Sequence, residues 1–87
     1  MLGAVLLTKF EKMTIEETNI LHEKAKDRKD GVYSFRGNLW VVKDGKFIAF
    51  ANPFGECYQR MGAFNYQIGT VKSYERKKKL TEWLRSQ

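Results

Sequence analysis

The chain has 87 residues and carries 16 lysines and arginines against 10 aspartates and glutamates, a net charge of +6. This length suits one hydrophobic core, because a second core would be short of apolar side chains. One cysteine and one histidine exclude an internal disulfide and a structural zinc site built from those residues. We therefore expect a single small domain in a reducing compartment, with the cytoplasm as its default location.

The first seven residues are apolar, but no basic segment precedes them. Lys9 and Glu11 follow well before the roughly 20 residues that a helix needs to span a bilayer. No small-residue cleavage motif follows Leu7, so the segment does not have the pattern of a secretory signal. We predict a buried strand over residues 2–8 and no association with a membrane.

A helix is predicted over residues 15–29. Thr14 and Glu17 have the spacing of a capping box, in which each side chain satisfies a backbone amide of the other residue. Ile15, Leu21 and Ala25 form a thin apolar stripe, and charged residues occupy the rest of the helix surface. We expect Gly31 to end the helix in a left-handed conformation.

From residue 32 onward, β-forming residues dominate and turn signals interrupt the chain at short intervals. Asp44-Gly45 between two apolar runs predicts a two-residue hairpin. The expected cross-strand pairs are Lys43 with Lys46, Val42 with Phe47, and Trp40 with Ala49. Both faces of the hairpin are then apolar, with Trp40, Val42 and Phe47 on one face and Leu39, Val41, Ile48 and Phe50 on the other.

Further turn signals predict strands over residues 32–35, 39–43, 46–51, 56–60 and 64–71. In the last strand, Phe64, Tyr66 and Ile68 alternate with polar residues, which is typical of one buried and one wet face. A C-terminal helix follows Ser73. The predicted fold class is α+β: an antiparallel five- to six-stranded meander or small barrel, with one helix in the N-terminal half and one at the C-terminus. We expect both helices on one face of the sheet, so that the sheet either closes or leaves a patch exposed.

The sequence contains no glycine-rich phosphate loop, nucleophile elbow or metal-binding histidine pair. Cys57 and His22 are the one nucleophile and base pair to consider, and a lone cysteine in a strand is usually a small buried hydrophobe. We therefore expect no enzymatic activity, no cofactor and no metal.

The positive charge is concentrated in residues 57–87, which hold seven cations and two carboxylates. A lysine run within a predicted helix could bind successive phosphates, and rings among cations could stack on unpaired bases. We expect exposure of Tyr33, Phe54, Tyr58 and Tyr74. The predicted nucleic-acid-binding residues are Arg36, Tyr58, Arg60, Lys72, Tyr74, Arg76, Lys77, Lys78 and Lys79. The alternative is that the lysines only maintain solubility.

A short basic chain with a leading apolar segment, an aromatic-rich meander and a lysine-rich C-terminal helix resembles the small accessory proteins of T4-like phages. Some of those proteins are basic, bind RNA and inhibit host toxin–antitoxin defence. The resemblance implies an RNA-binding protein of the same kind, and it assigns no role to an individual residue.

Two functional hypotheses follow. The first is a protein that binds RNA or single strands with little sequence specificity and acts by occupancy or sequestration. The second is a protein-interaction module that inhibits a host protein through an apolar sheet face or an edge strand. A homodimer is compatible with both hypotheses.

Overall fold

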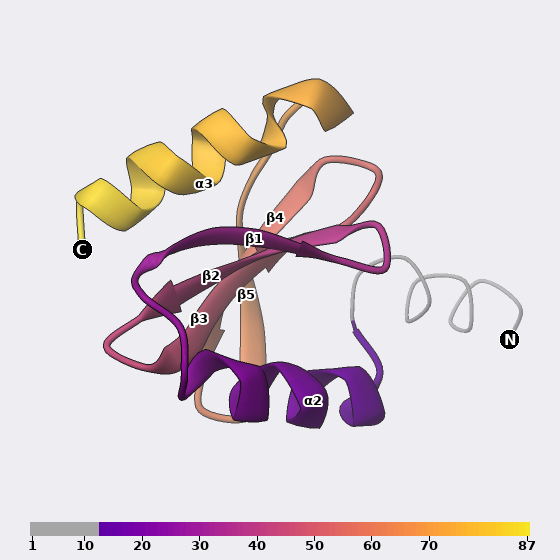
Figure 1. Cartoon of the computed structure of the whole chain (residues 1–87). Coiled ribbons are helices and arrows are strands. Elements are labelled where there is room, and N and C mark those ends of the chain that lie inside the picture. The colour runs from indigo at the N-terminus through magenta and orange to yellow at the C-terminus, as the bar shows by residue number, and fades with distance from the viewer. Residues whose placement is uncertain (1–12) are drawn as a thin grey trace, which may run out of the picture.

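The computed structural model describes residues 13–87. Its elements, in chain order, are helix α2 (Ile15–Ala25), strands β1 (Gly31–Phe35), β2 (Asn38–Lys43), β3 (Lys46–Ala51), β4 (Glu56–Met61) and β5 (Phe64–Thr70), the short 3-10 helix η1 (Ser73–Glu75) and helix α3 (Arg76–Arg85). The five strands form one antiparallel meander in sequence order (Figure 1). The α+β prediction is confirmed. The strand predicted over residues 2–8 lies outside the described residues.

Helix α2 begins where its sequence predicts and ends earlier. The Thr14 hydroxyl accepts from the Glu17 amide at 3.0 Å, and the Glu17 carboxylate accepts from the Thr14 amide at 3.1 Å, so the capping box is formed. The helix ends at Ala25, because residues 26–30 offer no apolar side chain to the sheet. Gly31 is the first residue of β1, and its predicted role as the left-handed end of the helix is wrong.

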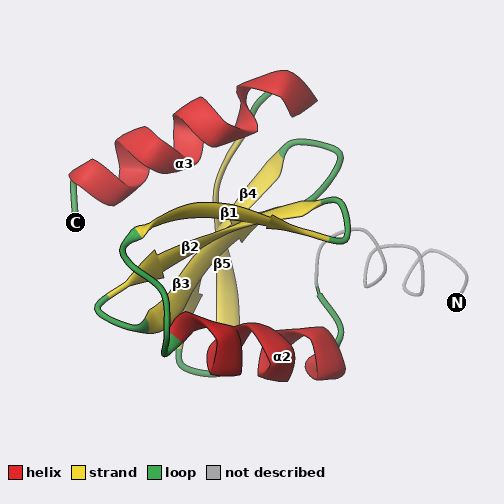
Figure 2. Ribbon diagram, in the orientation of Figure 1, coloured by secondary structure: helices red, strands yellow, loops and turns green. Residues whose placement is uncertain are grey.

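The two helices pack on opposite faces of the sheet, as Figures 1 and 2 show. On one face, Leu21 and Ala25 of α2 contact a cluster of buried rings and Val42. On the other face, Leu80 of α3 contacts Val41, Ala49, Ala51 and Cys57. The expectation that both helices share one face is therefore wrong. Within residues 13–87 the sheet is open, with β1 and β5 as its edge strands.

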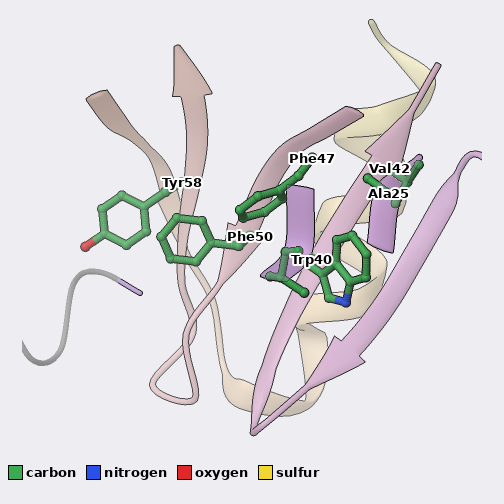
Figure 3. Close-up of a cluster of buried hydrophobic side chains, with 7 residues drawn as sticks. Ala25, Trp40, Val42, Phe47, Phe50 and Tyr58 are labelled. Atoms are coloured by element: carbon green, nitrogen blue, oxygen red, sulfur yellow. The ribbon is translucent and has the colours of Figure 1, made fainter. Parts of the chain in front are cut away.

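The β2–β3 hairpin has the predicted turn, with Asp44 and Gly45 both at positive φ. Lys43 pairs with Lys46 and Val42 with Phe47, as expected, but Trp40 pairs with Phe50 and not with Ala49. A bulge at Ile48 inserts one residue into β3 and turns Phe50 to the face of α2. Figure 3 shows the result, in which the rings of Trp40, Phe47, Phe50 and Tyr58 lie in a row across three strands.

Candidate nucleic-acid interface

Strand β5 exposes an apolar surface on the same face of the sheet as α3. Ala49 belongs to the α3 cluster and pairs with Gln59, which pairs with Tyr66. Met61 and its partner Phe64 lie two residues further along and therefore face the same side. Helix α3 packs mainly on β1, β2 and β3, and of the β4–β5 hairpin it covers the end at Cys57 and Ile68, away from Met61 and Phe64. The exposed fractions are 67% for Phe64, 52% for Tyr66 and 51% for Met61.

Cationic side chains lie beside this surface at the C-terminal end of β5. The Lys79 side chain crosses Gly69, where an added Cβ would lie 3.1 Å from Lys79 Cε. Gly69 and Tyr66 are three residues apart on β5, so roughly 10 Å separates them along the strand. Lys72 is exposed directly after the strand, between β5 and η1. The lysines thus lie at the C-terminal end of the strand that carries the exposed rings. We call this set of residues the β5 face: Met61, Phe64, Tyr66, Lys72, Lys78 and Lys79.

The lysine run does not form one patch. Successive helical residues are about 100° apart, so Lys77 and Lys79 lie on opposite flanks of α3. Lys78 and Lys79 line a shallow hollow of about 180 Å³ together with Glu75 and Glu82. The ion pairs within residues 13–87 are Lys26–Glu23 and Arg36–Glu17. Within that range the lysines of α3 are therefore near carboxylates without forming an ion pair with them.

Arg76 has a structural position at the start of α3. Its Nη1 donates to the carbonyl of Gly37 at 2.8 Å and to the carbonyl of Asn52 at 3.2 Å, and its Nε donates to Ser73. These bonds join α3 to the β1–β2 turn and to the loop after β3. Three of its five N–H donors therefore bind the backbone, and two remain for the phosphate contact that the sequence predicts for Arg76.

Arg60 and Arg36 lie away from the lysines. Arg60 is on the α2 face, where its guanidinium lies over the Phe47 ring at 5.4 Å and donates to Asn65 at 2.8 Å. It lines an open groove of about 420 Å³ between α2 and the β4–β5 turn, together with His22. Arg36 sits in the β1–β2 turn, 3.7 Å from the carboxylate of Glu17. The structure therefore does not bring these two arginines together with Lys78 and Lys79.

Some of the aromatic side chains predicted to contact nucleic acid are buried, and others are exposed. Tyr58 is 5% exposed and stacks on Phe50 with ring centroids 5.3 Å apart, so its predicted exposure is wrong. The bulge in β3 is the reason, because it turns Phe50 toward Tyr58. Tyr33 is half-buried, with Arg28 over its ring at 4.8 Å. Tyr74 on η1 and Phe54 in the loop before β4 are exposed, as expected.

Sequence reasoning missed Phe64 and Tyr66 as interface residues. Their alternation with Asn65 and Gln67 correctly places them on one face of β5. The pattern predicts that this face is buried, but both rings are more than half exposed. The position of β5 in the chain could have indicated this exposure. The last strand of a meander is an edge strand, and a helix of ten residues such as α3 covers only a few strands.

The Cys57–His22 pair does not form. Cys57 is buried under α3 and His22 lies on α2, so the sheet separates them. Burial raises the pKa of the Cys57 thiol, while Lys79 and Arg76 oppose that shift. The described part of the chain contains no group of three or more metal-ligating side chains. Over the same residues, no helix is long and apolar enough to cross a membrane.

Comparison of the chain with protein families, with curated proteins and with solved structures finds no match. The fold and the arrangement of side chains are therefore the basis for a functional proposal.

Proposed function

We propose that the protein binds single-stranded nucleic acid, RNA in particular, on the β5 face. The observation that carries the proposal is the exposure of Phe64 and Tyr66 on one side of an edge strand, with Lys79 over Gly69 farther along the same strand. Exposed rings on a sheet beside cations are a recurring platform for unpaired bases, because every base offers a π-face. The binding we infer has little sequence specificity.

The rings and the lysines of the β5 face would bind different parts of the nucleic acid. Phe64 and Tyr66 are two residues apart on one strand face, about 6–7 Å, which allows each ring to contact a different base. Lys72, Lys78 and Lys79 would bind phosphates at the C-terminal end of the strand. Glu75 and Glu82 reduce the local positive charge, so the rings contribute a large share of the affinity.

The biological action that we attach to this binding is occupancy or sequestration of RNA in the cytoplasm, as in the phage accessory proteins that the chain resembles. Binding without chemistry suits a face made of rings and lysines. The six members of the face include no histidine, cysteine or carboxylate.

The experiment is equilibrium binding to a fluorescein-labelled single-stranded RNA of mixed sequence, followed by anisotropy at low salt. Stacking contributes about 1–3 kcal/mol per base, so Tyr66→Ala and Phe64→Ala should each weaken binding by roughly fivefold or more. The control is Ile15→Ala, which removes an apolar side chain that is 82% exposed on α2, and it should leave affinity unchanged. Absence of binding by the unaltered protein, or equal losses in all three variants, would overturn the proposal.

A second candidate function is a protein-interaction module that uses the edge of β5. The apolar, exposed residues of this strand favour it, because an edge strand with free backbone groups can accept a strand from another chain. The two candidates differ in their response to charge. Replacing Lys72, Lys78 and Lys79 by Gln should weaken RNA binding strongly at physiological salt and leave association with a protein largely intact.

A further inference from the structure

The two edges of the sheet differ in how well they are protected. At β1, Arg28 lies over Tyr33, and Lys24 and Arg36 lie over Phe35, while α3 packs on the other face. A strand that approached β1 would meet these cations. Along β5, by contrast, residues 64–70 contain no charged side chain and no proline, and most of them are exposed. Native proteins rarely leave such an edge unpaired.

The N-terminal half of β5 is the part available for pairing. A bulge at Ile68 interrupts the ladder between Gln67 and Gly69, and Lys79 covers Gly69. Residues 64–67 remain as a regular, uncharged segment. Their outward backbone groups are self-complementary, because two antiparallel copies of one strand related by a two-fold axis exchange the same hydrogen bonds.

We propose that β5 pairs with β5 of a second copy of this chain around residues 64–67, with Tyr66 opposite its own counterpart at the two-fold axis, to form one continuous ten-stranded sheet. The charge distribution supports a second copy as the occupant despite the net charge of +6. The paired segments are neutral, and Arg60, the nearest cation on β4, is held over Phe47 and bonded to Asn65. The lysines of α3 lie at the far end of the strand.

Pairing about such an axis keeps corresponding faces of the two sheets on the same side. The β5 faces of the two copies therefore join, and this consequence rests on the proposed function. The floor consists of β4 and β5 from each copy and spans roughly 15 Å at the usual strand spacing of about 5 Å. Phe64 and Tyr66 of both copies line the floor, and the two α3 helices with Lys78 and Lys79 form its sides. The occupant inferred for this trough is an extended single strand, with bases on the rings and phosphates toward the lysines.

The test is sedimentation equilibrium of the full chain across the micromolar range without nucleic acid. The mass should rise toward twice the 10.2 kDa of one chain, with a micromolar dissociation constant because a short edge buries little surface. Gln67→Lys places a cation on the pairing segment and should weaken the dimer at least tenfold. Ser34→Lys, the matched change at an exposed position of the other edge, should leave the dimer unchanged.

Amide hydrogen exchange keeps the result interpretable if a variant is destabilised. The unaltered protein should protect the outward amides of residues 64–67 in a concentration-dependent manner, and Gln67→Lys should remove that protection. A protein that stays monomeric, or a dimer that Ser34→Lys weakens and Gln67→Lys does not, overturns the proposal. A dimer that fails to bind RNA would instead contradict the proposed function and leave the pairing intact.

Discussion

Arg76 Nη1 lies 2.8 Å from the carbonyl oxygen of Gly37, a residue 39 positions earlier in the chain. The same nitrogen donates to Asn52, so one guanidinium holds two loops against the start of α3. Hydrogen bonds from charged donors contribute about 1.5–3 kcal/mol. We expect Arg76→Ala to lower the free energy of unfolding by about 2–3 kcal/mol in urea titrations followed by tryptophan fluorescence.

Lys77→Ala is the control, because Lys77 follows Arg76 in the same helix, is exposed, and its side chain makes no hydrogen bond within residues 13–87. Its effect on unfolding should stay within about 0.5 kcal/mol. Equal destabilisation by both changes would show that Arg76 acts as a general surface cation and not as a link between loops.

Gly55 allows the loop before β4 to pass close to the chain after β5. Its φ is 92°, and a Cβ at this position would overlap the Val71 carbonyl, while its own carbonyl accepts from the Val71 amide at 2.9 Å. Gly55→Ala should therefore cost roughly 3 kcal/mol or more of stability. Gly62→Ala provides the comparison, because Gly62 has a φ of 64° with open space around it. Its cost should be about 1 kcal/mol, and similar melting temperatures for the two variants would contradict the placement of Gly55.

His22 should make stability depend on pH. Burial, and to a lesser extent Arg60, lowers the pKa of His22 in the folded protein below 6.5. Between that lowered pKa and 6.5 the unfolded chain binds more protons than the folded one, so stability increases as pH rises through this window. Above 6.5 the contribution is complete and flat.

The measurement for His22 is the urea midpoint at a series of pH values from 5 to 8. His22 is the chain's only histidine, so His22→Gln should flatten the rise that the unaltered protein shows just below pH 6.5. A profile that rises as pH falls through this window would mean that the folded protein stabilises the protonated ring.

Local chemistry predicted much of the fold. Thr14 and Glu17 form their capping box, and Asp44-Gly45 forms its turn, because both signals depend on residues within four positions of each other. The faces of β3 were not predictable in the same way. The bulge at Ile48 depends on packing between strands, and it alone moves Phe50 from one face of the sheet to the other.

The candidate site was predicted less completely than the fold. The charge of the C-terminal helix is visible in the sequence. The sequence does not show that the Arg76 guanidinium donates hydrogen bonds to the carbonyls of Gly37 and Asn52, which are distant in the chain. For Tyr66, the sequence predicts the sheet face but not its exposure. Its alternation indicates which face of β5 it occupies, and only the placement of α3 over the other strands decides that this face stays exposed.

Salt dependence should reveal how many phosphates the β5 face engages. Three lysines lie on it, so about three phosphate contacts on a single strand give a slope near −2 for the logarithm of affinity against that of salt. Lys78→Gln should reduce the magnitude of this slope by about 0.7, and Lys77→Gln, on the opposite flank of α3, should leave it unchanged. A slope steeper than about −4 would indicate that cations outside the β5 face take part.

The most direct measurement is photocrosslinking of the full chain to single-stranded RNA that contains 4-thiouridine, followed by mass spectrometry of the crosslinked peptides. The predicted result is crosslinks at Phe64 and Tyr66, lost when unlabelled RNA competes. Crosslinks restricted to the α2 face, around Tyr33 and Arg36 or in the groove beside Arg60, would contradict the assignment of the binding surface to β5.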